Sequence, residues 1–338
     1  MIAVFDGHND ALTTPDAGSI ASGRSGGHLD LPRMRAGGVR GGIFSIFIAS
    51  AEVEHEPQPG GGAPEFPPVA HARAAAETDV IIARLLELER VGAVRLARTT
   101  ADLDLARTDA GPPVAVMHVE GAEAIGTELV ELDALYDRGL RSLGPVWSRP
   151  NAFGHGVPFV SPSSPDTGPG LSSAGRALVT RCAQLGVLVD LSHVNEQGFW
   201  DVARLGVGPL VASHSAAHAL CPASRNLTDR QLDAIGASGG LIGIVFATNF
   251  LREDFERNPD TPLELIVAHA RYVAERIGVA HLALGSDFDG AIIPAPLGDV
   301  AGMPRLLDAL ATGGFTPDEV AQIAWDNWRR VLDAWWAR

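Results

Sequence analysis

Eight apolar segments of strand length, most of them separated by helix-like patterns, constrain the fold of this chain more than any other feature. They are Ile2–Phe5, Gly42–Ala49, Val114–Val119, Leu140–Trp147, Val187–Leu191, Pro209–Ser213, Leu241–Phe246 and Leu282–Ser286. Each is apolar throughout rather than alternating, as expected of parallel strands that are covered on both faces. About eight strand–helix units that close on themselves predict an α/β protein, a single (β/α)8 barrel.

The segments with helical periodicity support this alternation. They are Val69–Val91, Leu129–Arg138, Ser173–Leu185, Glu196–Leu205, Leu263–Ile277 and Pro317–Ala337. Ser172 and Thr316 stand where a capping residue would begin a helix. We expect one domain over residues 1–338, with long loops near 50–68 and 148–172. Both loops follow the C-terminal ends of predicted strands, where barrel enzymes build their sites.

Composition excludes several classes of function. The net charge of −15 argues against binding to nucleic acid, which requires a basic surface. The sequence contains neither an apolar run of about 18 residues nor a signal peptide or lipid-anchor signal, so we expect a cytoplasmic protein without membrane attachment. All 26 cationic residues are Arg. Without Lys, Schiff-base chemistry, a P-loop and a carboxylated Lys between two metals are excluded.

Ionisable residues gather at the ends of the predicted strands. His8 and Asp10 are two residues apart and therefore share a face where the first strand ends. Other strand ends carry Glu120, His193, His214, Asp287 and Asp289. Such side chains are costly at the end of a buried strand unless they are paired or bind a metal. Imidazole nitrogens and carboxylate oxygens suit zinc and its neighbours, so this pattern predicts a metal site at the C-terminal ends of the strands.

The number of candidate ligands indicates two metal ions. Three His and two carboxylates are too many for one catalytic ion that keeps an open position. They suit a pair of ions that shares a carboxylate. Since the chain has no Lys, a Glu or Asp must bridge them, and the longer side chain of Glu120 suits that task.

At this point the chain resembles a known family. The segments that carry the resemblance are "DGHND" (6–10), "VEG" (119–121), "GLSSAGRALVTRCAQLGVLVDLSHV" (170–194), "SHSAAHALCPASRN" (213–226) and "GSDFDG" (285–290). Their order and separations are similar to those of the membrane dipeptidase (renal dipeptidase) family, binuclear zinc peptidases of the amidohydrolase superfamily. The resemblance covers nearly the whole chain and implies a (β/α)8 barrel.

The resemblance implies a role for each candidate ligand. His8 and Asp10 would bind one Zn²⁺, and His193 and His214 would bind the other. Glu120 and a water or hydroxide would bridge the two ions. A hydroxide held between two dications is a nucleophile at neutral pH, because the metals lower the pKa of water.

Two further residues match the family's catalytic and substrate-binding positions. Asp287 matches the acid/base, which can take a proton from the attacking water and pass it to the leaving amine. Arg225 matches the residue that binds the substrate's free carboxylate, for which a planar guanidinium is well suited. From the residues alone, Arg225 could instead pair with Asp229 or Asp233. We interpret Asp289 as a loop brace rather than a catalytic group.

One position departs from the family pattern. Several members end the fourth strand with a His that contacts the substrate carbonyl, and the corresponding residue here is Trp147. His155 on the following loop is one candidate to replace that His, and Asn151 could orient the peptide instead. We expect the loops after strands two, four and seven to line the site, including Phe246 and Asn249.

These observations predict a zinc-dependent dipeptidase that hydrolyses small dipeptides, L-Xaa-D-Xaa as well as L,L. Removal of the metal should abolish this activity. The alternative is a binuclear metal hydrolase that acts on another small amide, lactam or ester. A third hypothesis is a zinc-dependent binding or structural protein without turnover, which would have a closed metal site. The family commonly forms homodimers, which the sequence does not test.

Overall fold

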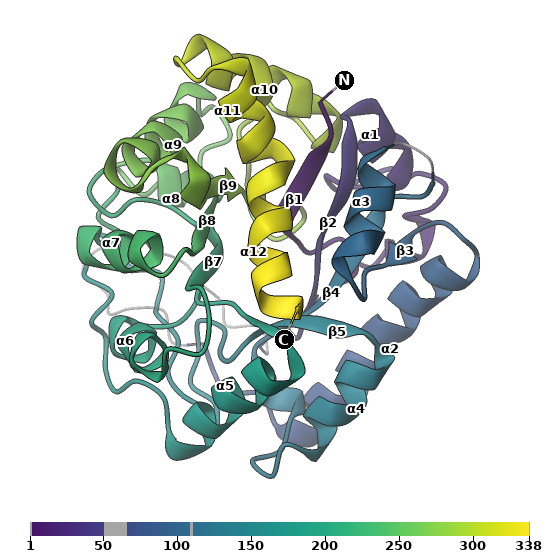
Figure 1. The fold of residues 1–338 in the computed structure, drawn as a ribbon, viewed down its shortest axis with the longest axis vertical. Coiled ribbons are helices and arrows are strands. Elements are labelled where there is room, and N and C mark those ends of the chain that lie inside the picture. Colours follow the sequence, from purple (N-terminus) through teal and green to yellow (C-terminus); the bar gives the residue numbers. More distant parts are fainter. Residues whose placement is uncertain (1, 51–65, 109–110, 338) are drawn as a thin grey trace.

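A computed structural model describes residues 2–50, 66–108 and 111–337 of the chain. Its strands are β1 (Val4–Asn9), β2 (Val39–Phe47), β3 (Arg95–Leu96), β4 (Val114–Glu120), β5 (Leu140–Gly144), β6 (Leu188–Val189), β7 (Val211–Ser215), β8 (Leu241–Ile244) and β9 (Leu282–Leu284). Figure 1 shows these strands at the centre of the molecule, with helices around them.

The strands pair in parallel and in sequence order, as the alternation predicts. One sheet has the order β1-β2-β4-β5-β6, with the short β3 paired beside β4, and the other has the order β7-β8-β9. Isolated parallel bridges connect the two sheets at both seams: Asp190 pairs with Val211, and Asn9 pairs with Phe288. The predicted α/β class is confirmed, and the eight strands other than β3 follow the strand order of a (β/α)8 barrel.

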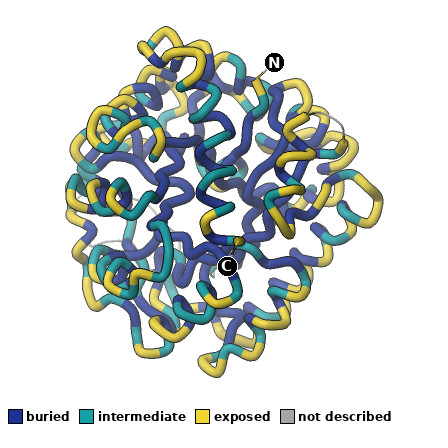
Figure 2. The backbone as a smooth tube through the Cα atoms, in the orientation of Figure 1, coloured by how far each residue is buried: buried dark blue, intermediate teal, exposed yellow. Residues whose placement is uncertain are grey.

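The helices cover the outside of the strands. They are α1 (Leu31–Ala36), α2 (His71–Arg90), α3 (Thr100–Arg107), α4 (Val130–Arg138), α5 (Ser173–Leu185), α6 (Glu196–Leu205), α7 (Asp229–Ala237), α8 (Thr248–Leu251), α9 (Glu264–Ile277), α10 (Met303–Thr312), α11 (Pro317–Ala321) and α12 (Asn327–Trp336). Figure 2 shows the consequence for burial: apart from Arg95 of the short β3, no strand residue is exposed, and exposure is otherwise confined to the outer faces of the helices and to loops.

The C-terminal helix α12 covers the end of the strands at which they begin (Figure 1). Trp335 donates a hydrogen bond to the carbonyl of Pro209, just before β7, and Trp328 donates to Leu284 in β9. Trp328 also packs on Phe5 of β1, with 5.8 Å between ring centroids. The tryptophans therefore close the core, and the opposite end of the strands is left for the site.

The ends of several elements differ from the prediction. β1 continues to Asn9, so His8 lies within the strand, and β5 already ends at Gly144. The long helix predicted at the C-terminus is divided by a π-helical turn at Gln322–Asp326. The predicted caps are confirmed: Ser172 and Thr316 each accept a hydrogen bond from a backbone N–H of the first turn.

The two predicted loops differ in how far they can be followed. The first, near 50–68, lies mostly outside the described residues. The second runs from β5 to α5 without a helix or strand, apart from isolated bridges at Asn151 and Gly156. None of the described helices is long and apolar enough to cross a bilayer.

Candidate metal centre and cavity

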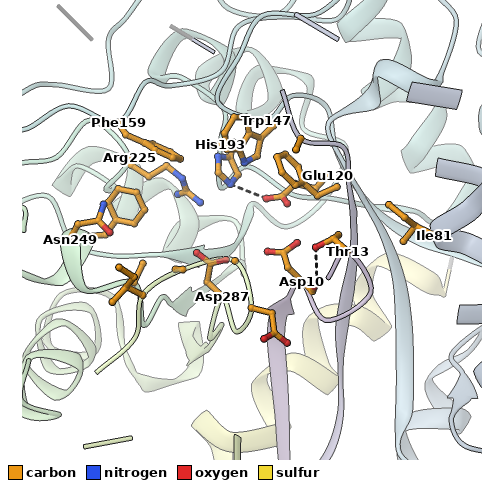
Figure 3. A pocket seen from close by; sticks show the side chains of 18 of the residues that line it. Asp10, Thr13, Ile81, Glu120, Trp147, Phe159, His193, Arg225, Asn249 and Asp287 are labelled. Atoms are coloured by element: carbon orange, nitrogen blue, oxygen red, sulfur yellow. Dashed lines mark hydrogen bonds and ion pairs between the residues drawn. The ribbon is translucent and has the colours of Figure 1, made fainter. Parts of the chain in front are cut away.

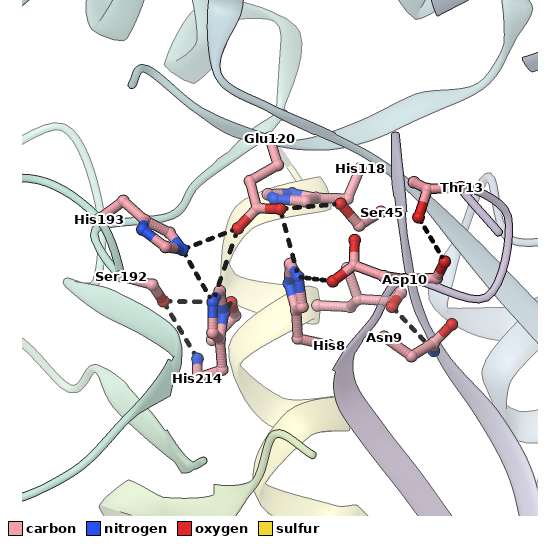
Figure 4. Close-up of polar contacts among 12 residues, drawn as sticks. His8, Asn9, Asp10, Thr13, Ser45, His118, Glu120, Ser192, His193 and His214 are labelled. Carbon is pink, nitrogen blue, oxygen red and sulfur yellow. Dashed lines mark hydrogen bonds and ion pairs between the residues drawn. The ribbon is translucent and has the colours of Figure 1, made fainter. Parts of the chain in front are cut away.

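The five predicted metal ligands meet at the C-terminal ends of the strands, as Figure 4 shows. His8 lies in β1, with Asp10 directly after it, and Glu120 is the last residue of β4. His193 follows β6, and His214 lies in β7. All five are at most 6% exposed. The chain therefore places three imidazoles and two carboxylates in a region from which water is largely excluded.

Glu120 stands at the centre of this cluster (Figure 4). Its Oε1 lies 2.9 Å from Nε2 of His193 and 3.6 Å from Nε2 of His214, while its Oε2 lies 3.6 Å from Nε2 of His8. Nε2 of His8 is also 3.8 Å from Oδ2 of Asp10. Each oxygen of Glu120 thus serves one side of the cluster, the arrangement expected of a bridging carboxylate.

The donor atoms fit metal ions better than they fit one another. Neither ring nitrogen of His8 has a hydrogen-bond partner in the described part of the chain, and Oδ1 of Asp10 has none either. The Nε2 atoms of His193 and His214 approach to 3.1 Å. Buried lone pairs without partners are costly, and a cation between them removes that cost.

Two sets of three ligands are compact enough to hold an ion. They are His8, Asp10 and Glu120, and Glu120, His193 and His214, with the ligand atoms of each set within 4.8 Å of one another. Glu120 belongs to both sets. A further combination joins His8, His214 and Asp190. The first two sets match the division into two metal sites that the resemblance implies.

Burial and charge set the protonation of the imidazoles. Burial, together with the nearby Arg225, lowers the pKa of His193 to about 4. Burial also holds the pKa of His214 well below its usual range. Around His8 burial acts in the same direction, but Glu120 and Asp10 outweigh it and raise the pKa. His193 and His214 are therefore neutral, as a metal ligand must be, and the surroundings of His8 favour a positive charge.

The side chains that orient these ligands were not predicted from the sequence. The hydroxyl of Ser45 donates to Oε2 of Glu120 at 3.1 Å. Hydroxyls of Ser148 and Ser213 lie 2.8 Å from Nδ1 of His193 and of His214 respectively. The only available signal was a polar residue inside, or just after, an otherwise apolar strand. Such outer contacts fix the orientation of metal ligands.

The cluster opens into a cavity of about 720 Å³, drawn in Figure 3. The predicted residues that line it are Asp10, Glu120, Trp147, His193, Arg225, Asn249, Asp287 and Asp289. Its aromatic wall of Phe47, Phe159 and Phe250 was not predicted from the sequence. Phe159 contacts the ring of Trp147, with 5.6 Å between centroids. The cavity thus joins a charged floor to an apolar side.

Asp287 projects into this cavity from the turn after β9 (Figure 3). Its φ of 61° lies in the left-handed region. A Cβ atom at Gly290 would collide with carboxylate oxygens of both Asp10 and Asp287, so only Gly allows these two groups to approach as they do. Burial, followed by the charge of Asp10, raises the pKa of Asp287 well above its usual range.

Asp289 braces the same turn, as interpreted from the sequence. Its carboxylate accepts hydrogen bonds from the guanidinium of Arg24 and from the backbone N–H of His28. In return, the backbone N–H of Asp289 donates to Nδ1 of His28 at 3.0 Å. The turn that carries Asp287 is therefore fixed to the segment that follows β1.

Arg225 reaches the cavity from the segment between β7 and α7 and is only 3% exposed. Its guanidinium donates to Oγ of Ser215 at 2.7 Å and to the carbonyl of His214 at 2.9 Å. The alternative of a pair with Asp229 or Asp233 is wrong, because both carboxylates pair with Arg276. Burial lowers the pKa of Arg225 to about 10. A bound anion would offset the free-energy cost of burying this positive charge.

Three of the remaining predicted residues do not line this cavity. Asn151 is occupied within its own loop, since its amide donates to Pro145 and accepts from the N–H of Phe153. His155 and Phe246 are absent from the cavity lining among the described residues, and Phe246 packs on Phe288 in the core. The structure therefore gives no support to His155 or Asn151 as replacements at the position of Trp147.

We expect a divalent cation to stabilise the folded protein. At 100 times its dissociation constant, a ligand that binds only the folded state contributes about 2.7 kcal/mol per site. For two sites in a chain of this size, the melting temperature of the chelator-treated protein should rise by roughly 8 °C when Zn²⁺ is added. Differential scanning calorimetry measures this shift. An equal melting temperature with and without the metal would contradict the binding site.

Comparison with known proteins gives the same assignment. The sequence profile described as membrane dipeptidase, peptidase family M19, matches residues 1–335. A metallo peptidase from Rhodobacter sphaeroides, liganded with a phosphinate mimic of the dipeptide L-Ala-D-Ala, superposes with a TM-score of 0.95 at 44% identity over 99% of both chains. The structure of "dipeptidase AC" gives a TM-score of 0.93 at 45% identity, with 100% and 99% of the two chains covered.

A relative in sequence supports this assignment. The protein from the pqqA 5′ region of Klebsiella pneumoniae is 47% identical over 75% of this chain and 94% of its own length. The profile match spans nearly the whole chain and includes every predicted ligand. The chain therefore belongs to the membrane dipeptidase family, peptidase family M19, and is a metallo-dipeptidase.

Proposed function

We propose that this enzyme uses two Zn²⁺ ions to hydrolyse the amide bond of small dipeptides, L-Xaa-D-Xaa as well as L,L. One observation carries the proposal: Asp287, Arg225 and the bridging candidate Glu120 line the same cavity. His8 and Asp10 would hold one ion, and His193 and His214 the other. The metals would supply Lewis acidity and lower the pKa of a water, which makes it a nucleophile at neutral pH.

Arg225 provides the anchor for the free carboxylate of the substrate. Its guanidinium is buried, is held in place by Ser215 and by the carbonyl of His214, and makes no ion pair with a described acidic residue. A substrate carboxylate would give this desolvated cation its counter-ion. The distance from Arg225 to the cluster then limits how long a substrate can be, which favours a dipeptide over a longer peptide.

Asp287 provides the proton transfer. Its surroundings raise the pKa of the carboxyl well above the usual range, so it can hold a proton at a pH where an exposed Asp is ionised. It can accept a proton from the attacking water and donate it to the leaving amine. The left-handed turn, braced by Asp289, keeps the carboxyl directed at the cavity.

Two observations support the choice of dipeptide. The relative from R. sphaeroides was solved with a mimic of L-Ala-D-Ala, at 44% identity over almost the whole chain. Within the aromatic wall, Phe159 and Phe250 give an apolar surface for a small side chain. A residue of either configuration at the C-terminal position can place its carboxylate on Arg225, so we propose activity toward both L,D- and L,L-dipeptides.

Replacement of Arg225 tests the carboxylate anchor. A hydrogen-bonded charge contact contributes about 1.5–3 kcal/mol, so kcat/KM of Arg225→Ala for L-Ala-D-Ala should fall about 10- to 100-fold. The slower hydrolysis of the C-terminal amide of the same dipeptide should be unchanged by the substitution. Arg257→Ala is the matched control, because Arg257 is an exposed arginine that lines the same cavity. The kcat/KM of Arg257→Ala for L-Ala-D-Ala should fall less than threefold.

The same assays separate the two candidate functions. If Arg225→Ala hydrolyses the free dipeptide as fast as the unchanged enzyme, the carboxylate-anchored mechanism is wrong. Activity restricted to compounds without a free carboxylate would instead favour hydrolysis of another small amide, a lactam or an ester.

A further inference from the structure

A network of short hydrogen bonds lies at the ring nitrogen of His214 that faces away from Glu120. Nδ1 of His214 is 2.8 Å from Oγ of Ser213, and the same Oγ is 2.5 Å from Oδ2 of Asp190. Ser192 binds the other oxygen of Asp190 through its hydroxyl, at 2.7 Å. Figure 4 shows Ser192 beside His214. All of these side chains are buried.

The direction of these bonds follows from the number of protons. Asp190 accepts from two backbone N–H groups as well as from both hydroxyls, and this set of donors is that of an ionised carboxylate. A hydroxyl has one proton, so Ser213 donates it to Asp190 and can only accept from His214. His214 must then carry its proton on Nδ1. Its Nε2 keeps a lone pair, directed toward Glu120 and His193.

We propose that Asp190 and Ser213 are positioning residues, which hold His214 in the tautomer whose Nε2 can bind a metal ion. The inference rests on the proposed role of His214 as a metal ligand. Neutral His has two tautomers, and the partner at one ring nitrogen decides which of them is present. Asp190 determines the tautomer of His214, because its carboxylate accepts the proton of the Ser213 hydroxyl and so fixes the direction of that hydroxyl.

Asp190 acts through His214 rather than on the metal. It lies close enough to His8 and His214 to be considered as a ligand. Both of its oxygens, however, already accept hydrogen bonds: Oδ1 accepts from the hydroxyl of Ser192 and from two backbone amides, and Oδ2 accepts from the hydroxyl of Ser213. His193 has no such carboxylate in its network. Its Nδ1 contacts the hydroxyl of Ser148, and no carboxylate in the described part of the chain accepts a hydrogen bond from that hydroxyl.

Ser213→Ala and Ser192→Ala form a matched pair that tests the proposal. Both serines donate to Asp190, and the hydroxyl of Ser192 also accepts from the backbone N–H of His214, but only Ser213 contacts the imidazole ring. Loss of an outer partner of a metal ligand typically weakens metal affinity about 10- to 100-fold. We therefore expect Ser213→Ala to bind Zn²⁺ about 10- to 100-fold more weakly in competition with a chromogenic chelator, and Ser192→Ala to change less than threefold. This readout needs no substrate.

Asp190→Asn provides a second test that keeps the size of the side chain. An amide NH₂ that faces Ser213 would donate to the hydroxyl and turn its proton toward Nδ1 of His214. The ring would then carry its proton on Nε2, the wrong tautomer for metal binding, by the same logic that applies when the triad Asp of a serine protease becomes Asn. ¹⁵N spectra of the metal-free, His-labelled protein should show Nδ1 of His214 protonated before the substitution and Nε2 after it.

The experiments distinguish failure of the positioning role from failure of the metal site itself. Zn²⁺ affinities that are equal in Ser213→Ala and Ser192→Ala, or a His214 that is already protonated at Nε2 in the unchanged protein, would overturn the proposal. His214→Ala identifies a different failure. If that variant binds Zn²⁺ as tightly as the unchanged protein, His214 is not a ligand, and the proposed metal site itself is wrong. Circular dichroism of each metal-free variant confirms that it is folded.

Discussion

Glu120→Gln should remove nearly all activity, because it alters the one group that faces both halves of the metal cluster. Oε1 of Glu120 lies near His193 and His214, and Oε2 near His8. The substitution keeps the shape but removes the charge and replaces one oxygen by a proton donor. We expect the loss of kcat/KM to exceed the roughly 10- to 100-fold that accompanies loss of an outer partner. Metal content should fall from the two ions per chain that we propose to one or none.

Mass spectrometry of the metal-loaded protein under native conditions measures that content, and dipeptide hydrolysis measures the activity. Glu77→Gln is the matched control. Glu77 lines the same cavity, but its side chain is 44% exposed and pairs with Arg73 on α2, so its replacement should leave the metal content unchanged and the activity within about twofold. Two bound ions in Glu120→Gln would show that another group bridges them.

The strand pattern allowed much of this site to be predicted from the sequence. Parallel strands in a barrel all direct their C-terminal ends to one rim. His8, Glu120 and His214 could therefore be placed together, although more than 200 residues separate the first from the last. The apolar runs showed where each strand ends, and therefore that these ionisable side chains lie at the C-terminal ends of the strands. The family resemblance added the roles of Asp287 and Arg225, for which spacing alone left alternatives.

Other parts of the site could not be predicted, because they depend on distances within loops. Asn151 and Trp147 lie four residues apart, yet the first is bonded within its loop and the second lines the cavity. No periodicity distinguishes them. The partners of the ligands were equally hidden: Ser213 and Ser148 are common polar residues, and only the atomic contacts show that each faces an imidazole.

Helix ends were predictable where a local signal exists. Ser172 and Thr316 were recognisable as caps, because capping is a contact between neighbours in sequence. The π-helical turn at Gln322–Asp326 is different, since nothing in the local pattern marks it. Trp325 within this turn and Trp328 just after it both pack on Phe5 of β1, a tertiary contact that the helical period alone does not encode.

Asp287→Asn should lower kcat without releasing the metals. The amide fills the same space between Asp10 and Arg225 but cannot carry a proton to the leaving amine. General acid–base catalysis typically contributes about 10²- to 10⁴-fold, and we expect a loss of that size for L-Ala-D-Ala. The loss should be smaller for the corresponding depsipeptide, in which an ester replaces the amide, because an alkoxide leaving group is less basic than an amine anion and needs the proton less.

This comparison separates proton transfer from the other roles that Asp287 could have at its position. A carboxylate that only held a metal would lose metal content with the charge, and amide and ester would then suffer alike. A carboxylate that only repelled Asp10 would, once neutralised, relieve a like-charge contact that now contributes to the raised pKa of Asp287. Metal affinity would then rise and kcat would be retained. Only a proton carrier gives full metal content, a large loss on the amide and a smaller loss on the ester.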